Sequence, residues 1–253
     1  MRYALLLMMF LSASSARAVG LHVYGPGGPA PAMKEAAATF AKARNIHVEV
    51  TAGPTAEWKA LANKDADLIF SGSESMMTDF LAAFPDLDPA TVRPLYLRPS
   101  AILVRPGNPK RIKGVGDLLA PGRRILVVQG SGQGGLWEDV AGRLGDIRSV
   151  RAMRANIVMF AGNSGEAKKS WQTDPSIDAW LIWNIWQVAN PRLADMVEIE
   201  PQYRIHRDTG VALTRRGRSN PQAQAFVDFL ASHEGVKIFA KWGWMTGDGH
   251  PAQ

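Results

Sequence analysis

The chain has 253 residues, of which 46% are hydrophobic and 21% charged, with a net charge of +6 and no cysteine. This composition excludes a disordered chain, a collagen-like repeat and a small domain held together by disulfides. The length fits one large domain or two lobes, because a single hydrophobic core stops growing near roughly 250 residues.

The N-terminus has the pattern of a cleavable secretory signal. Arg2 supplies a positive charge, residues 4–11 are apolar, and Ala16-Arg17-Ala18 places small residues where a signal peptidase cuts. The apolar stretch is too short to cross a bilayer, which takes about 20 residues. We therefore expect residues 1–18 to be a signal peptide. We expect the mature protein to be periplasmic, not membrane-embedded and, since no cysteine follows the signal, not lipid-anchored.

The first half of the remaining sequence alternates between β-rich runs and stretches with helical periodicity. Each β-rich run leads into a loop rich in Gly, Pro, Ser or Thr, and a helix-like stretch follows. The strand–loop pairs are residues 21–24 with 25–29, 46–51 with 53–55, and 67–70 with 71–73. On the first helix, Met33, Ala36, Ala37, Phe40 and Ala41 fall on one face. Three such units predict one α/β lobe.

The second half repeats this order. The strand–loop pairs are residues 124–128 with 129–135, 156–160 with 162–165, and 178–182 with 183–184. Alternating strands and helices indicate mainly parallel sheets flanked by helices on both faces. The second set of three therefore predicts a second lobe.

Two long β-rich runs predict how the lobes connect. Residues 92–104 follow the first set of strands, residues 197–213 follow the second, and helices at 220–232 and 234–244 end the chain. We expect the two long runs to cross between the lobes as hinge segments and the final helices to rejoin the first lobe. The predicted domains are lobe 1, residues 19–99 and 209–253, and lobe 2, residues 100–208.

The loops after the strands predict where a ligand binds. In open α/β sheets, ligands collect at the carboxyl ends of the strands. There, the following helices present unpaired N–H groups and roughly half a positive charge, which favours anions. We expect up to six such helix ends to face one cleft. Because Ser and Thr also cap helices that bind nothing, capping alone is the alternative for Thr55, Ser73 and Ser164.

Three larger side chains are candidates for the same cleft. Arg98 and Arg207 lie one on each crossing segment, where a guanidinium can hold a carboxylate or phosphate through two hydrogen bonds. Trp183 stands at a strand-to-helix junction, where an indole can stack on a ligand. The alternatives are arginines exposed on the surface and a tryptophan packed in the core.

Other kinds of site are disfavoured by residue spacing. Residues 130–135 match the G-x-G-x-x-G pattern, but the next strand ends without the acidic residue that dinucleotide binding needs. The sequence has no Gly-Lys-Ser/Thr phosphate loop and no G-x-S-x-G nucleophile motif, and its five histidines lack metal-binding spacing. The basic clusters lack interleaved aromatic residues, so we expect a solvated surface and no nucleic-acid binding.

Segments spread along the chain resemble one known family. They are VYGPGGP (23–29), GPTAEW (53–58), DADLIFSGS (65–73), PLYLR (94–98), WED (137–139), NIVMFAGNSG (156–165) and DAWLIW (178–183). Together they resemble type II periplasmic solute-binding proteins of the sulfate/molybdate-like class, and within that class the accessory colonisation factor C branch of adhesin-like binding proteins.

The resemblance implies a fold, a function and a set of ligand contacts. The fold is two α/β lobes that close over a ligand in a Venus-flytrap motion. The function is capture of a small oxyanion, polycarboxylate or phosphorylated acid, such as citrate or phosphoglycerate, without chemistry, cofactor or metal. Carried over to this sequence, the contacts are Gly27, Gly28, Thr55, Ser71, Gly72, Ser73, Ser131, Gly132, Gln133, Gly134, Asn163, Ser164, Gly165 and Trp183. Arg98 and Arg207 complete the candidate set.

The expected partners are a small anionic ligand and an ABC-type permease. One alternative is a surface adhesin that binds host glycans and whose cleft is vestigial. Another is an exported hydrolase or lyase, although the sequence shows no nucleophile paired with a base. The identity of the anion and the formation of a homodimer stay open at this point.

Overall fold

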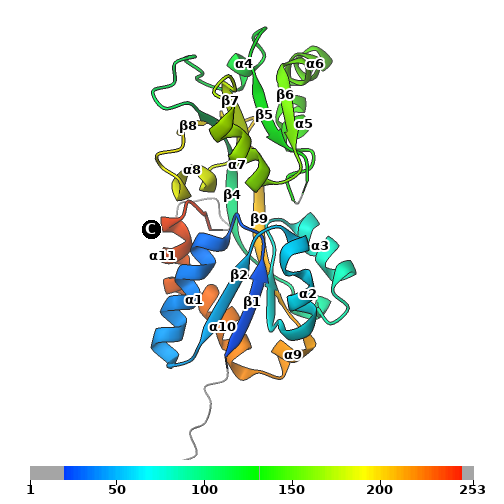
Figure 1. The fold of residues 1–253 in the computed structure, drawn as a ribbon, viewed down its shortest axis with the longest axis vertical. Helices are drawn as coiled ribbons and strands as arrows, with labels where there is room; N and C mark the ends of the chain where they lie inside the picture. Colours follow the sequence, from blue (N-terminus) through cyan, green and yellow to red (C-terminus); the bar gives the residue numbers. More distant parts are fainter. Residues whose placement is uncertain (1–19, 131, 247–253) are drawn as a thin grey trace, which may run out of the picture.

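The structure, a computed structural model, describes residues 20–130 and 132–246, and the predicted signal peptide lies outside these residues. Two lobes lie one above the other along the long axis, joined where strands β4 (Arg93–Val104) and β9 (His206–Leu213) lie side by side (Figure 1). The predicted two-lobed α/β fold is confirmed.

Lobe 1, the lower lobe in Figure 1, is built on three parallel strands. These are β2 (Val48–Ala52), β1 (Leu21–Gly25) and β3 (Leu68–Phe70), in that order across the sheet. β9 continues the sheet antiparallel to β3. Because the three strands are parallel, their carboxyl ends lie at one edge of the sheet, and this edge faces the other lobe.

Helices cover lobe 1, and the C-terminal helices pack against it. The elements are α1 (Ala30–Arg44), α2 (Thr55–Asp65), α3 (Glu74–Ala83), the 3₁₀ turn η1 (Pro89–Thr91), α9 (Arg215–Arg218), α10 (Pro221–Leu230) and α11 (His233–Lys241). The Phe40 ring on α1 lies 5.2 Å from Phe226 and 5.5 Å from Phe229, both on α10. The apolar face of α1 therefore packs against the last part of the chain.

Lobe 2 has the same organisation. Its strands are β6 (Ile157–Ala161), β5 (Ile125–Val128) and β7 (Ala179–Trp183), which are parallel, and β8 (Asp195–Glu198), which pairs with β4. Its helices are α4 (Val115–Leu118), α5 (Leu136–Gly142), α6 (Ile147–Asn156), α7 (Ser164–Thr173) and α8 (Ile185–Ala189).

Two elements of lobe 2 differ from the sequence prediction. The long β-rich run expected at residues 197–213 is divided into β8 and β9, with a turn between them. Helix α6 was not expected, because three arginines interrupt its apolar residues. Its one clear start signal is Asp146, whose side chain accepts a hydrogen bond from the Ser149 N–H at 2.9 Å.

β4 changes partners at the junction of the lobes. Residues 93–99 pair with β9, and residues 100–104 pair with β7. β7 and β8 both pair with residues 101–104, so they lie on opposite edges of β4. The strands of the described residues thereby form one sheet that runs through both lobes, and the hinge lies near residues 99–100.

A third segment also reaches the hinge. Leu97 and Met245 exchange two backbone hydrogen bonds, with N···O distances of 2.9 Å and 2.7 Å. The end of the described chain therefore lies along β4, which is one of the two predicted crossing segments.

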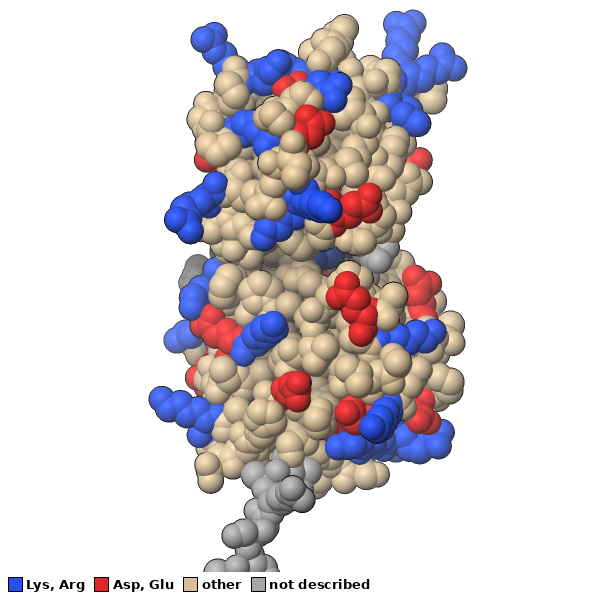
Figure 2. Space-filling view, in the orientation of Figure 1, with Lys and Arg blue, Asp and Glu red and all other residues tan. Residues whose placement is uncertain are grey.

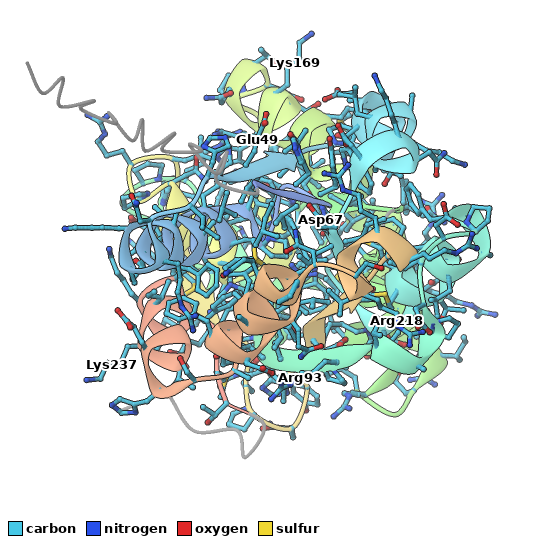
Figure 3. The ribbon with its side chains drawn as sticks, turned by 90° about the horizontal axis from the view of Figure 1, so that it is seen from below. Glu49, Asp67, Arg93, Lys169, Arg218 and Lys237 are labelled. Atoms are coloured by element: carbon cyan, nitrogen blue, oxygen red, sulfur yellow. The ribbon has the colours of Figure 1, made fainter. Side chains whose placement is uncertain are left out.

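Charged side chains of lobe 1 mostly project into solvent. Viewed from below, Arg218 and Lys237 lie at the periphery, whereas Asp67 lies near the centre (Figure 3). Asp67 is fully buried and accepts a hydrogen bond from Nε of Arg216 at 3.2 Å. This ion pair ties the start of β3 to α9.

Tyr96 tests how β4 is held in lobe 1. Its ring stacks on Phe239 of α11 at 4.4 Å, and its hydroxyl donates to the backbone carbonyl of Leu230. Burial raises the pKa of Tyr96 to about 12. We expect Tyr96→Phe to lower the free energy of unfolding by about 1 kcal/mol, because the buried carbonyl loses its donor while the stacking is kept.

Urea unfolding followed by circular dichroism measures this change. Tyr203→Phe is the matched control, because its hydroxyl has no hydrogen-bond partner among residues 20–130 and 132–246. Equal stabilities for the two variants would contradict the role given to the Tyr96 hydroxyl.

Candidate functional site

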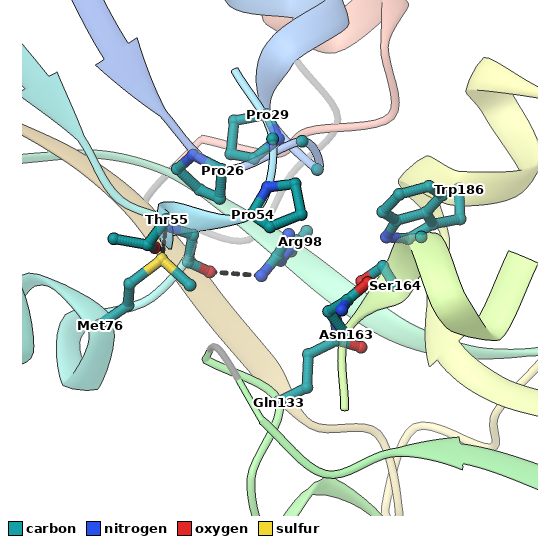
Figure 4. Close-up of a pocket in the computed structure, with 15 residues that line it drawn as sticks. Pro26, Pro29, Pro54, Thr55, Met76, Arg98, Gln133, Asn163, Ser164 and Trp186 are labelled. Atoms are coloured by element: carbon teal, nitrogen blue, oxygen red, sulfur yellow. Dashed lines mark hydrogen bonds between the residues drawn. The ribbon is translucent and has the colours of Figure 1, made fainter. Parts of the chain in front are cut away.

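A cavity lies between the lobes, at the carboxyl ends of the parallel strands (Figure 4). Its volume is about 170 Å³, close to the roughly 150 Å³ of a protein cavity that holds benzene. In space-filling view the junction is a waist between the lobes, with basic side chains spread over the outer faces (Figure 2). The lining residues are Pro26, Gly27, Gly28, Pro29, Gly53, Pro54, Thr55, Gly72, Met76, Arg98, Gln133, Asn163, Ser164, Gly165 and Trp186.

Helix N-termini from both lobes converge on this cavity. Its walls include the residues just before or within the first turns of α1, α2, α3 and α7. The first N–H groups of each helix have no partner within the helix, and each helix end carries partial positive charge. The cavity is therefore electropositive before any side chain is counted.

Two of the predicted polar residues serve as helix caps. Ser73 accepts a hydrogen bond from the Met76 N–H at 3.1 Å, and Asn163 accepts one from the Glu166 N–H at 2.9 Å. Thr55 and Ser164 do not act as caps, because the N-cap positions of their helices are Pro54 and Asn163. The hydroxyls of Thr55 and Ser164 therefore differ from that of Ser73 in not being used by helix N–H groups, and the Ser164 hydroxyl instead accepts a hydrogen bond from Gln133.

Arg98 adds a formal positive charge to the partial charges of the helix N-termini. It lies on β4 at the hinge and is only 3% exposed. Its guanidinium donates a hydrogen bond to the carbonyl of Gly72 and packs against the rings of Trp183 and Trp244, at 4.7 Å and 5.3 Å. Nη1 lies beside Gly28, where an added Cβ would approach it to 3.0 Å. The glycine therefore leaves the guanidinium room to face the cavity.

This charge has no counter-ion within the described residues. In the part of the chain that the structure describes, no carboxylate forms a salt bridge with Arg98, and its Nε is buried without a hydrogen-bond partner. Burial lowers the pKa of Arg98 to about 9, with a smaller opposing effect from Asp208 and a lowering by Arg207. A buried, unpaired cation costs free energy. An anion in the cavity would offset that cost.

Further polar atoms without partners line the lobe 2 side. Nε2 of Gln133 donates to the Ser164 hydroxyl at 2.5 Å, while its Oε1 is buried and unpaired. Nε1 of Trp186 is also buried and unpaired, and it points toward the cavity beside Gly28. The cavity thus offers several donors and one acceptor to a guest.

The Ser71–Ser73 loop and Gly132 face each other across this gap. A Cβ added at Gly132 would lie 2.7 Å from the Ser73 hydroxyl, and Gly132 has φ +74°. Ser73 and Gly132 come from different lobes, so the lobes touch at this point. The two sheet ends therefore share one cleft.

Most of the candidate residues from the sequence come together at the cavity. Those that line it are Gly27, Gly28, Thr55, Gly72, Arg98, Gln133, Asn163, Ser164 and Gly165. Ser71 and Ser73 are buried beside the cavity in the same loop as Gly72, and Gly132 forms the contact between the lobes. Gly134 does not line the cavity, and Ser131 lies outside the described residues.

Trp183 and Arg207 are placed differently from the prediction. Trp183 is fully buried at the end of β7, pairs with Ser100 of β4, and packs behind Arg98 without reaching the cavity. Arg207 lies opposite Arg98 in the β4–β9 pairing, but its guanidinium forms an ion pair with Asp139 of α5 at 2.6 Å. It is Trp186, three residues after Trp183, that lines the cavity.

Sequence reasoning missed the apolar part of the lining. Pro26, Pro29 and Pro54 stand in the predicted loops but have no polar group to suggest a site. Met76 and Trp186 lie in the first turns of α3 and α8. Their position at helix starts was the one available signal.

The described residues show neither a metal site nor a membrane span. Among residues 20–130 and 132–246, no three or more His, Asp or Glu side chains are arranged to hold a metal ion. Within the same ranges, no helix combines the length and hydrophobicity needed to cross a membrane.

A family model described as "Bacterial extracellular solute-binding protein" matches residues 21–245. A search of curated proteins finds no match. Among solved structures, PEB3 with bound L-phospholactate is 36% identical, covers 89% of this chain and 99% of its own, and has a TM-score of 0.84. Peb3 from Campylobacter jejuni gives 35% identity, the same coverage and a TM-score of 0.82.

Two more distant structures share the fold. The sulfate-binding protein SubI from Mycobacterium tuberculosis is 20% identical, covers 92% of this chain and 88% of its own, and has a TM-score of 0.74. The molybdate-binding protein of Azotobacter vinelandii is 17% identical, with coverage of 89% and 98% and a TM-score of 0.68.

The missing counter-ion of Arg98 has a consequence for stability. We expect Arg98→Met to raise the free energy of unfolding by about 1 kcal/mol or more, because an apolar side chain replaces a buried, unpaired cation. Thermal and urea unfolding measure this change after the protein has been dialysed against a buffer that contains no phosphate, sulfate or carboxylate.

Arg105→Met is the matched control. Arg105 donates hydrogen bonds to the carbonyls of Ile177, Trp171 and Asp174 at 2.9, 2.8 and 2.6 Å. Removing this satisfied guanidinium should destabilise the protein. If both variants were destabilised to the same degree, Arg98 would be a structural residue like Arg105.

Proposed function

The chain belongs to the family of bacterial extracellular solute-binding proteins, and from this we propose that it captures a small anion in the cavity between its lobes. The family match and the similarity to Peb3 confirm the predicted resemblance to type II periplasmic solute-binding proteins. Arg98 supports the proposal most directly, because it is a buried cation that faces the cavity and lacks a carboxylate partner.

The proposed guest is a phosphorylated or polycarboxylic organic acid. PEB3, 36% identical to this chain, has been crystallised with L-phospholactate, a molecule with both a phosphate and a carboxylate. Arg98 can receive one anionic group through two hydrogen bonds, while the helix N-termini of the opposite lobe receive the other. A cavity of about 170 Å³ suits a molecule of this size.

The proposed role is capture and release without chemical change. Among residues 20–130 and 132–246, the cavity lining contains no Cys, His, Asp or Glu that could serve as a nucleophile or base. We propose that the protein works in the periplasm and delivers its ligand to an ABC-type permease. The glycan-binding adhesin and the exported hydrolase or lyase find no specific support in the described residues.

A thermal-shift panel tests the proposal. The compounds are sulfate, molybdate, phosphate, citrate, L-phospholactate and 3-phosphoglycerate. A ligand present at 100 times its Kd stabilises the folded state by about 2.7 kcal/mol, which raises Tm by several degrees for a protein of this size. We expect the largest shift from a phosphorylated acid. No shift with any of these anions would contradict anion capture.

Arg98→Met should remove the charge that holds the anion. We expect its affinity for the best compound of the panel to fall more than tenfold, measured by isothermal titration calorimetry, because a charge-assisted hydrogen bond is worth about 1.5–3 kcal/mol. Arg207→Met is the control and should bind within twofold of the unsubstituted protein, since Arg207 pairs with Asp139 outside the cavity. Unchanged affinity in Arg98→Met would remove Arg98 from the binding site.

Gly132 tests closure of the lobes. An alanine there would meet the Ser73 hydroxyl at 2.7 Å in a backbone conformation that favours glycine. With saturating ligand, we expect Gly132→Ala to keep a larger radius of gyration in small-angle X-ray scattering and to bind roughly tenfold more weakly. Gly134→Ala is the control, because an added Cβ at Gly134 meets nothing within 4 Å. Identical scattering from the two variants would contradict the contact between these loops.

A further inference from the structure

A second cavity lies at the hinge, beside β4. Its volume is about 280 Å³. Pro99, Ser100 and Ala101 of β4 line it, and the residue just before them, Arg98, lines the first cavity. The hinge strand therefore borders both cavities.

Both lobes contribute to this second cavity. Lobe 2 supplies Asn184, Met196, Glu198 and Arg204, and lobe 1 supplies Ala240, Gly243, Trp244 and Met245. The two sides are tied by a hydrogen bond from Nδ2 of Asn184 to the carbonyl of Gly243, at 2.6 Å. Any rotation of the lobes about the hinge must change the shape of this space.

The lining defines the chemistry of an occupant. Oδ1 of Asn184 is a buried acceptor without a partner, and Asn184 itself is only 9% exposed. Arg204 and Glu198 neutralise each other through an ion pair of 3.0 Å. The hydroxyl of Ser100 accepts a hydrogen bond from the Ile205 N–H at 2.9 Å, and the remaining surface comes mainly from Ala, Pro, Met and Trp side chains. These features fit a neutral, largely apolar molecule with one hydrogen-bond donor.

Trp244 connects the two cavities. It lines the second cavity and also lies 5.3 Å from the guanidinium of Arg98 in the first. Asn184 directly follows Trp183, whose ring lies 4.7 Å from the same guanidinium. An occupant of the second cavity would therefore be one side chain away from the charged group of the cleft.

We propose that this second cavity binds a small, neutral, largely apolar molecule with one hydrogen-bond donor, and that its occupancy holds the cleft closed. In this structure the lobes touch across the cleft at Gly132 and Ser73. Because both lobes supply walls of the second cavity, an occupant that fits it contacts both of them and stabilises the relative orientation of the lobes found here. A filled second cavity therefore favours the closed state and raises the affinity for the anion.

Side chains that fill the cavity test the coupling. Ala240→Leu fills it from lobe 1, and Met196→Trp fills it from lobe 2, where the Met196 side chain is 37% exposed. We expect both variants to have a smaller radius of gyration without ligand than the unsubstituted protein. We also expect them to bind the best anion of the panel several-fold more tightly. Ala60→Leu, on the exposed surface of α2, is the matched control and should change neither quantity.

Phenol and toluene test the binding chemistry. By saturation-transfer NMR, we expect the unsubstituted protein and the Ala60→Leu variant to bind phenol. Both should bind toluene about tenfold more weakly, because toluene has no donor for Asn184. The Ala240→Leu variant should bind neither compound. Phenol should also reduce the radius of gyration of the ligand-free protein. Failure of phenol to bind, or an unchanged radius in both filled variants, would overturn the proposal.

The affinity effect rests on the proposed anion capture, but the scattering of ligand-free protein does not. If no anion shifted Tm while both filled variants still contracted, the proposed function would fail and the second cavity would stand. If anions bound and neither variant contracted, the proposed function would stand and the proposal for the second cavity would fail.

Discussion

The structure depends on a positive charge held in the hinge without a counter-ion. Arg98 is buried on the strand that both lobes share, with two indole rings packed against its guanidinium and one carbonyl as its hydrogen-bond acceptor. Helix N-termini of both lobes point at the same space, so their dipoles add to the positive potential there. The buried charge costs free energy when the cavity is empty, and an anion bound in the cavity offsets that cost.

The sequence could predict the placement of a residue where that placement depends on its neighbours in the chain, and could not where it depends on contacts with distant residues. The strand–loop–helix order set the two lobes, and the position of Arg98 on a crossing segment placed it at the cleft. Trp183 ends a strand that is buried on both faces, so no alternation in the sequence could tell which side it faced. Arg207 turns to Asp139, 68 positions away in the chain, and a contact of that separation has no local signal. Helix α6 was hidden because its arginines dilute the apolar spacing.

The unpaired polar atoms at the hinge are informative as a group. Nε of Arg98, Oε1 of Gln133 and Nε1 of Trp186 surround the first cavity, and Oδ1 of Asn184 borders the second. Buried polar atoms in native proteins normally find partners, because an unmade hydrogen bond costs free energy. Such atoms at both cavities mark places where a partner from outside the chain can complete the structure.

The order of the strands along the chain also affects folding during synthesis. All the strands that complete the lobe 2 sheet lie in the continuous stretch from β4 to β8, whereas the lobe 1 sheet needs β9 and its helical layer needs α10 and α11. The upper lobe can thus be complete while the first three strands still expose an apolar edge. A nascent chain of this protein would therefore carry a folded lobe 2 and an incomplete lobe 1 until its last helices emerged. The apolar surface exposed on the incomplete lobe 1 would bind holdase chaperones.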